Sequence, residues 1–260
     1  MRDVPVVAVG DPVLAQFVAD REPDSDVLGI LVHGSRASGT HREDSDYDLI
    51  CIVSDEAYRA RSTDGRLHER VALANGLTGD LFFQAPSRSA EDIGAPGWFT
   101  PTYLGADLVF DRTGEVSSLL SRMRVEAGRI AREQVATAYD GYLNSFVRSM
   151  KSARSGDDLG RRLHAAESAL ALIRTLFGLE SQWPPYHDSL HAALPAIEQA
   201  QDWPPGHLSM ALTRLVSDGD APFQQQLEGQ VERLMSSRGI DHEWGTDLEP
   251  LKALDFGGGA

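Results

Sequence analysis

Two aspartates, Asp46 and Asp48, stand one residue apart in front of the apolar run 49–53. Side chains at positions i and i+2 of a strand point to the same face, so a strand here would hold both carboxylates side by side, with Cβ atoms about 6–7 Å apart. Such carboxylates repel each other, and a neighbouring strand would add a cost of desolvation. A divalent cation removes the conflict, and a carboxylate pair completed by water and phosphate oxygens suits Mg²⁺. The alternative is a solvated acidic loop, because Glu43 and Asp44 precede the pair.

A glycine-serine turn lies shortly before the aspartates. Gly34 would let a ligand approach the backbone closely, and Ser35 offers a hydroxyl and an amide to phosphate oxygens. Arg36 could also reach a phosphate, although most loop arginines are simply exposed. Gly34 and Gly39 have the separation of a Walker A loop, but Thr-His at 40–41 replaces its Lys-Ser/Thr, which excludes a P-loop ATPase.

A third carboxylate, Asp80, stands in the otherwise apolar stretch "LTGDLFF" at 77–83. A lone charge in such a strand is costly unless it faces a site. If this strand lies beside the one that carries Asp46 and Asp48, the three acids converge. The alternative is a residue of an edge strand that faces water.

The stretch "GSRASGTHREDSDYDL" at 34–49 resembles the GS-x(n)-SD-x-D signature of the polymerase-β-like nucleotidyltransferase superfamily. It is most similar to the bacterial minimal and antibiotic-modifying members, of the aminoglycoside or lincosamide type, which pair a small nucleotidyltransferase domain with a helical bundle. The resemblance implies the transfer of a nucleoside monophosphate from a nucleoside triphosphate.

The resemblance also assigns roles to single residues. Asp46 and Asp48 would ligate Mg²⁺, and Gly34 and Ser35 would hold the β- and γ-phosphates. Asp80 matches the third acid, which acts as base on the acceptor hydroxyl in small-molecule members. Several antibiotic-modifying relatives carry Glu at that place, whereas this chain has Asp.

Further candidates lie in the carboxyl-terminal half. Asn144, Arg148 and Lys151 follow at helical spacing opposite an apolar stripe, so the two basic side chains could bind a triphosphate or simply form a solvated face. Glu167 would face the cleft between the domains, from the resemblance alone, or form an ion pair on its helix. Four aromatic residues could line an acceptor pocket, although most of them would only pack in a core: Trp183, Tyr186, Trp203 and Trp244.

The pattern of apolar residues along the chain predicts the elements that must position these residues. They indicate an α+β fold, with a small mixed sheet followed by a helical bundle. A helix is expected at 12–21, with Asp11 as N-cap and Pro12 at its first position. Apolar or alternating runs predict the strands 26–34, 46–54, 66–73, 76–84 and 106–115, with a hairpin turn at Asn75-Gly76.

Helical periodicity follows over 116–154 and 157–180, and shorter helices are expected at 187–200, 206–217 and 222–237. In the helix at 157–180, five residues are expected along one apolar stripe: Leu163, Ala166, Leu170, Ile173 and Phe177. The chain thus divides into a nucleotidyltransferase domain, 1–115, and a helical domain, 116–260.

Composition limits the possible partners and compartment. The 260-residue chain has 39 acidic and 24 basic residues, a net charge of −15, which argues against nucleic acid as a partner. No apolar run approaches the roughly 20 residues of a membrane span, and the amino terminus is a poor signal peptide. The single cysteine, Cys51, allows no internal disulfide, and we expect a cytoplasmic protein.

These observations predict a magnesium-dependent nucleotidyltransferase, with ATP as co-substrate and two Mg²⁺ ions. It would transfer AMP to a hydroxyl of a small molecule and release pyrophosphate. An acidic cleft favours a polycation, so an aminoglycoside- or lincosamide-like antibiotic, and hence antibiotic resistance, is the leading expectation. Two alternatives remain: modification of a protein or tRNA, as in toxin–antitoxin systems, and a non-catalytic nucleotide-binding module.

Overall fold

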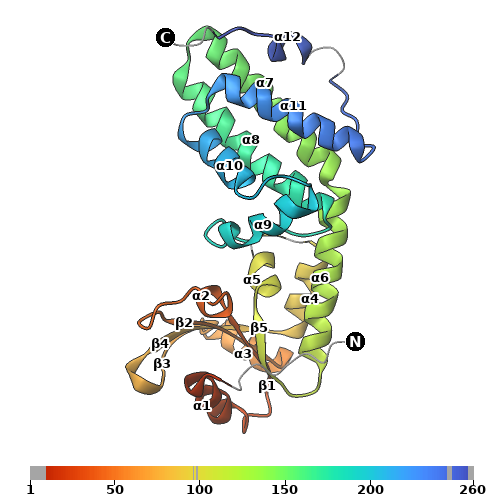
Figure 1. Ribbon diagram of the computed structural model, residues 1–260. Helices are drawn as coiled ribbons and strands as arrows, with labels where there is room; N and C mark the ends of the chain where they lie inside the picture. The colour runs from red at the N-terminus through yellow and green to blue at the C-terminus, as the bar shows by residue number, and fades with distance from the viewer. Residues whose placement is uncertain (1–9, 96, 98, 245–247, 257–260) are drawn as a thin grey trace. The chain divides into compact units, whose positions relative to one another are not determined.

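In the computed structural model, which describes residues 10–95, 97, 99–244 and 248–256, five strands form one mixed sheet (Figure 1). The strands lie in the order β3-β4-β2-β1-β5. Their bounds are β1 (Val27–His33), β2 (Tyr47–Val53), β3 (His68–Ala72), β4 (Thr78–Gln84) and β5 (Asp107–Asp111). Each strand falls within a predicted segment, and the α+β class is confirmed.

The pairing of β2 with β4 is parallel, and the other neighbouring strands are antiparallel. The expected hairpin joins β3 to β4 through a short 3₁₀ turn, η2 (Ala74–Gly76), at the predicted Asn-Gly turn. β4 lies between its hairpin partner β3, at the edge of the sheet, and β2, so β4 pairs with both strands.

The sheet buries apolar side chains on both faces, as the continuous apolar runs predict. One face packs against α1 (Pro12–Arg21) and α3 (Asp55–Thr63), and its core includes Phe17, Ile30, Leu49, Cys51 and Leu81. The opposite face packs against α4 (Pro86–Gly94), α5 (Thr100–Leu104) and the first turns of α6 (Glu115–Glu133), and its core includes Leu31, Ile50, Ile52, Tyr103 and Leu120.

Side-chain caps explain where two of these helices begin. Asp11 accepts hydrogen bonds from the amides of Val13 and Leu14, so α1 begins at Pro12 as predicted. Ser54 Oγ accepts from the amide of Ala57 at the start of α3. The mostly polar α3 has no apolar stripe, which is why periodicity does not predict it.

The chain divides into two compact units, Met1–Ala127 and Gly128–Ala260. The division falls inside α6, and the boundary expected at 115–116 lies at the beginning of that helix. The amino-terminal segment that was judged a poor signal peptide lies largely in residues 1–9, which are outside the described part of the chain.

The second unit is helical. It contains α7 (Val135–Ser155), α8 (Asp158–Leu179), α9 (Leu190–Ala200), α10 (His207–Ser217), α11 (Ala221–Ser237) and α12 (Glu249–Lys252). The long helices α7 and α8 pack along each other (Figure 1). No helix within the described residues is both long enough and apolar enough to cross a membrane.

The buried face of α8 agrees with the expected stripe at Ile173 and Phe177 but differs from it earlier in the helix. Leu163 and Leu170 are 57% and 42% exposed, so their assignment to the core is wrong. Small residues, Ala165 and Ala169, are buried instead, and Ala165 lies against the backbone of Gly219. Close approach between packed segments selects for small side chains, which hydrophobic periodicity alone does not reveal.

Candidate active site

Two of the three acids predicted to act together lie on adjacent strands, and the third, Asp46, lies directly before one of them. In the parallel pair β2 and β4, Asp48 is in register with Asp80. Paired residues of neighbouring strands project from the same face. Asp46 lies one residue before β2, and alternation places it on the face of Asp48. The expected adjacency of these strands is therefore confirmed.

Electrostatics reflects this proximity. Burial raises the pKa of Asp48, and the negative charges of Asp46 and Asp80 raise it further. The sheet thus holds Asp48 in a position where its ionised form is disfavoured. A cation beside the carboxylates would reverse that balance.

The glycine-serine turn lies directly against Asp48. His33, the last residue of β1, pairs with Asp48, and Gly34 begins the short helix α2 (Gly34–Ala37). Gly34 has φ +68°, and a Cβ placed on it would lie 2.2 Å from Asp48 Oδ2. The close approach to this carboxylate is a reason for glycine that the sequence did not indicate. The backbone carbonyl of Ser35 accepts a hydrogen bond of 2.9 Å from the amide of Thr40, which closes the turn.

Burial lowers the pKa of His33 to about 4, so this imidazole is neutral near pH 7. The register places it on the same sheet face as Asp48. His33 was not among the predicted site residues. Its position immediately before Gly34 is the only feature of the sequence that could have indicated its place in the site.

Arg36 joins the turn to the beginning of β2. Its Nε donates to the backbone carbonyl of Asp46 at 3.1 Å, and Nη2 donates to that of Ser45. The guanidinium also lies 3.7 Å from the centre of the Tyr47 ring, and Tyr47 donates its hydroxyl proton to Asp11 Oδ2 at 2.8 Å. These contacts give Arg36 a role in holding the aspartate-bearing segment, while its contact with a nucleotide stays a prediction.

Asp80 has a neighbour that sequence analysis missed. His68 Nε2 of β3 lies 3.4 Å from Asp80 Oδ1, and the His68 ring stacks on Phe82 with ring centres 4.3 Å apart. The alternating pattern of "RLHERVAL" at 66–73 places His68 on one strand face, but it does not indicate which strand lies next to it.

No group of three or more His, Cys, Asp or Glu side chains arranged to hold a metal is found within the described residues. Two carboxylates, from Asp46 and Asp48, are nevertheless the donor set from which Mg²⁺ is bound when water and phosphate complete its coordination. Because Gly34 has no Cβ, the backbone of the turn can lie directly beside Asp48 Oδ2, one of these hard oxygen donors. The residues present therefore fit the ion.

The remaining predicted residues lie in the second unit. Arg148 and Lys151 are exposed on α7, and Arg148 Nε donates to Asn144 Oδ1 at 3.3 Å. On α8, Glu167 Oε2 lies 2.9 Å from His164 Nδ1, which forms the ion pair on the helix when the imidazole is protonated. The contribution of Arg148, Lys151 and Glu167 to a site in the first unit stays a prediction.

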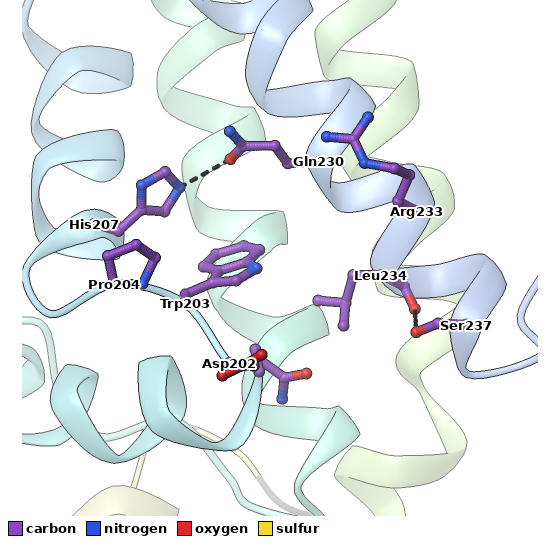
Figure 2. A pocket seen from close by; sticks show the side chains of 9 residues that line it. Asp202, Trp203, Pro204, His207, Gln230, Arg233, Leu234 and Ser237 are labelled. Carbon is purple, nitrogen blue, oxygen red and sulfur yellow. Dashed lines mark hydrogen bonds between the residues drawn. The ribbon is translucent and has the colours of Figure 1, made fainter.

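A pocket of about 540 Å³ is lined by residues of the second unit, and Figure 2 shows their side chains. The loop between α9 and α10 contributes Trp203, whose ring meets His207 edge-on at 5.2 Å between ring centres. His207 Nε2 and Gln230 Oε1 of α11 lie 2.9 Å apart. Figure 2 marks this hydrogen bond with a dashed line. None of the predicted catalytic or nucleotide-binding residues lines this pocket.

Residues 13–93 match the family model described as "Nucleotidyltransferase domain". The matched segment includes the glycine-serine turn and all three acids, so the similarity to a nucleotidyltransferase domain falls on the first unit and on its candidate site. A comparison with curated proteins found no match. Among solved structures, the chain is similar to a nucleotidyltransferase-like protein from Exiguobacterium sibiricum, with 12% identity, coverage of 92% of this chain and 86% of that chain, and a TM-score of 0.43.

Proposed function

We propose that this protein transfers a nucleoside monophosphate, AMP from ATP, to a hydroxyl group of a small molecule and releases pyrophosphate. One observation carries the proposal. Within the matched domain, Asp48 and Asp80 are in register on parallel strands, and the turn at Gly34 packs against Asp48.

Each residue then has a defined task. Asp46 and Asp48 hold two Mg²⁺ ions, while Gly34 and Ser35 bind the β- and γ-phosphates. When bound, Mg²⁺ supplies charge neutralisation for the triphosphate and for the departing pyrophosphate. Asp80 accepts the proton of the acceptor hydroxyl as its oxygen attacks the α-phosphorus and the bond to the bridging oxygen breaks.

The acceptor is proposed from charge. The net charge of −15 favours a cationic amino alcohol, such as an aminoglycoside- or lincosamide-like antibiotic. Arg148 and Lys151 are proposed to contact the triphosphate, and Glu167 the acceptor. We place the activity in the cytoplasm, because ATP is available there and the single, buried Cys51 is compatible with a reducing compartment.

The test uses purified protein, Mg²⁺, ATP labelled at the α-phosphate and a panel of aminoglycosides and lincosamides. Label in the antibiotic together with release of pyrophosphate supports the proposal. Label in co-purified protein or added tRNA instead would assign a macromolecular acceptor. ATP binding without turnover on any acceptor, and with no effect of Asp80→Asn on that binding, would indicate a non-catalytic module.

A further inference from the structure

We propose that His68 is a positioning residue for Asp80, an inference that rests on the proposed function. The evidence is a pair of contacts made by one ring. His68 Nε2 lies 3.4 Å from Asp80 Oδ1, and the ring is stacked on Phe82 at an interplanar angle of 15°. Phe82 thereby restricts the orientation of the imidazole, and the imidazole in turn faces one defined oxygen of Asp80.

The place of His68 in the sheet makes this arrangement specific. β3 is an edge strand, paired only with β4 among the described strands, and His68 pairs in register with Phe82, two residues after Asp80. The His68 side chain is 51% exposed and that of Asp80 is 30% exposed, so the pair borders solvent where an acceptor can arrive. The distance of 3.4 Å is longer than an ideal hydrogen bond, and such catalytic contacts commonly shorten when substrate binds.

The consequence for the reaction is a division of labour between the two oxygens of Asp80. In the proposed reaction, the N–H at His68 Nε2 donates to Oδ1 as the two atoms, 3.4 Å apart in this structure, approach each other, which fixes the carboxylate and leaves Oδ2 to take the acceptor proton. As the acceptor oxygen bonds to the α-phosphorus, the bond to pyrophosphate breaks and the hydroxyl proton moves to Oδ2. His68 keeps its own proton throughout, so it orients the base without exchanging protons with substrate.

Two substitutions separate stacking from hydrogen bonding. His68→Phe preserves an aromatic ring over Phe82 and removes the N–H, whereas His68→Gln retains an amide N–H near the position of Nε2. We expect His68→Phe to lower kcat about ten- to hundred-fold with the KM for ATP within about two-fold, because an orienting partner acts on the chemical step. His68→Gln should recover part of kcat. His191→Phe, at an exposed position of α9, is the matched control and should leave kcat unchanged.

A second measurement is independent of turnover. Thermal unfolding of His68→Phe, Asp80→Asn and the double variant forms a cycle, and the shifts in Tm should be non-additive if the two side chains interact. An unchanged kcat in His68→Phe, a rise in KM alone, or additive shifts in Tm would overturn the inference. Absence of turnover by the unaltered protein on every acceptor would instead refute the proposed function, and the Tm cycle would still decide whether His68 holds Asp80.

Discussion

Replacing Gly34 by alanine tests whether the turn must lie against Asp48. A Cβ at this position would lie 2.2 Å from Asp48 Oδ2, whereas ordinary contacts begin at 3.4 Å. The carboxylate must therefore retreat by about 1 Å or rotate, since overlap at 2.2 Å is strongly repulsive. The atom concerned is the end of a side chain, so the sheet can remain folded while Asp48 moves.

A matched control is available within the same loop. Gly39 has φ +71°, close to the +68° of Gly34, but a Cβ there would meet nothing within 4 Å. Both alanine variants therefore carry the strain of a left-handed backbone, roughly 1–2 kcal/mol, and should lose a similar few degrees in Tm. Only Gly34→Ala displaces the carboxylate, and a displacement of about 1 Å at a reacting centre can cost about 10²-fold in rate.

The assay is the rate of pyrophosphate release with Mg²⁺ and ATP, together with calorimetric titration of Mg²⁺-ATP. We expect Gly34→Ala to lose about 10²-fold in kcat/KM relative to Gly39→Ala at comparable Tm. Equal activity and equal Mg²⁺-ATP affinity in the two variants would refute the reasoning, because the position of Asp48 would then not matter.

Three further outcomes follow from charge and burial. Asp48→Asn should abolish transfer yet raise the Tm of the metal-free protein at pH 7, because the folded state raises the pKa of Asp48. That gain should shrink as the pH falls through the raised pKa and vanish below about 3.8, where the carboxyl is protonated in both states, and a gain constant from pH 3 to 8 would contradict it. The buried Glu198 carboxylate accepts hydrogen bonds from two backbone amides at the start of α10. Glu198→Ala should therefore lower the free energy of unfolding, measured in urea, by about 2–4 kcal/mol, and a loss under about 1 kcal/mol would contradict this. Lys252→Met should lower the free energy of unfolding by about 3–5 kcal/mol, because it leaves the fully buried Glu228, 3.2 Å from Lys252 Nζ, without its cation. Adding Glu228→Gln should recover most of that loss, and an unchanged stability in Lys252→Met would show that the pair contributes nothing.

The sequence predicted the local features of the site. Gly34, Asp46 and Asp48 lie within one segment of 15 residues, so their spacing and their turn-to-strand context could be read directly. The strands and most helices were predicted because burial imposes a period of two or 3.6 on the chain. The short, mostly polar helix α3 was not predicted, because it has no fully buried residue and its sequence carries little apolar pattern.

The tertiary structure decided what touches these residues. Periodicity does not specify strand order, and the acids converge only because β4 pairs with β2 while its hairpin partner β3 lies outside. The contacts of His68 with Asp80 and of Arg36 with the beginning of β2 depend on that order and on side-chain direction. The exposed Leu163 shows the same limit in the helical unit, because its apolar character did not reveal which face of α8 is buried. Sequence records which residues favour burial or charge, whereas pairing and packing between distant segments determine which of them meet.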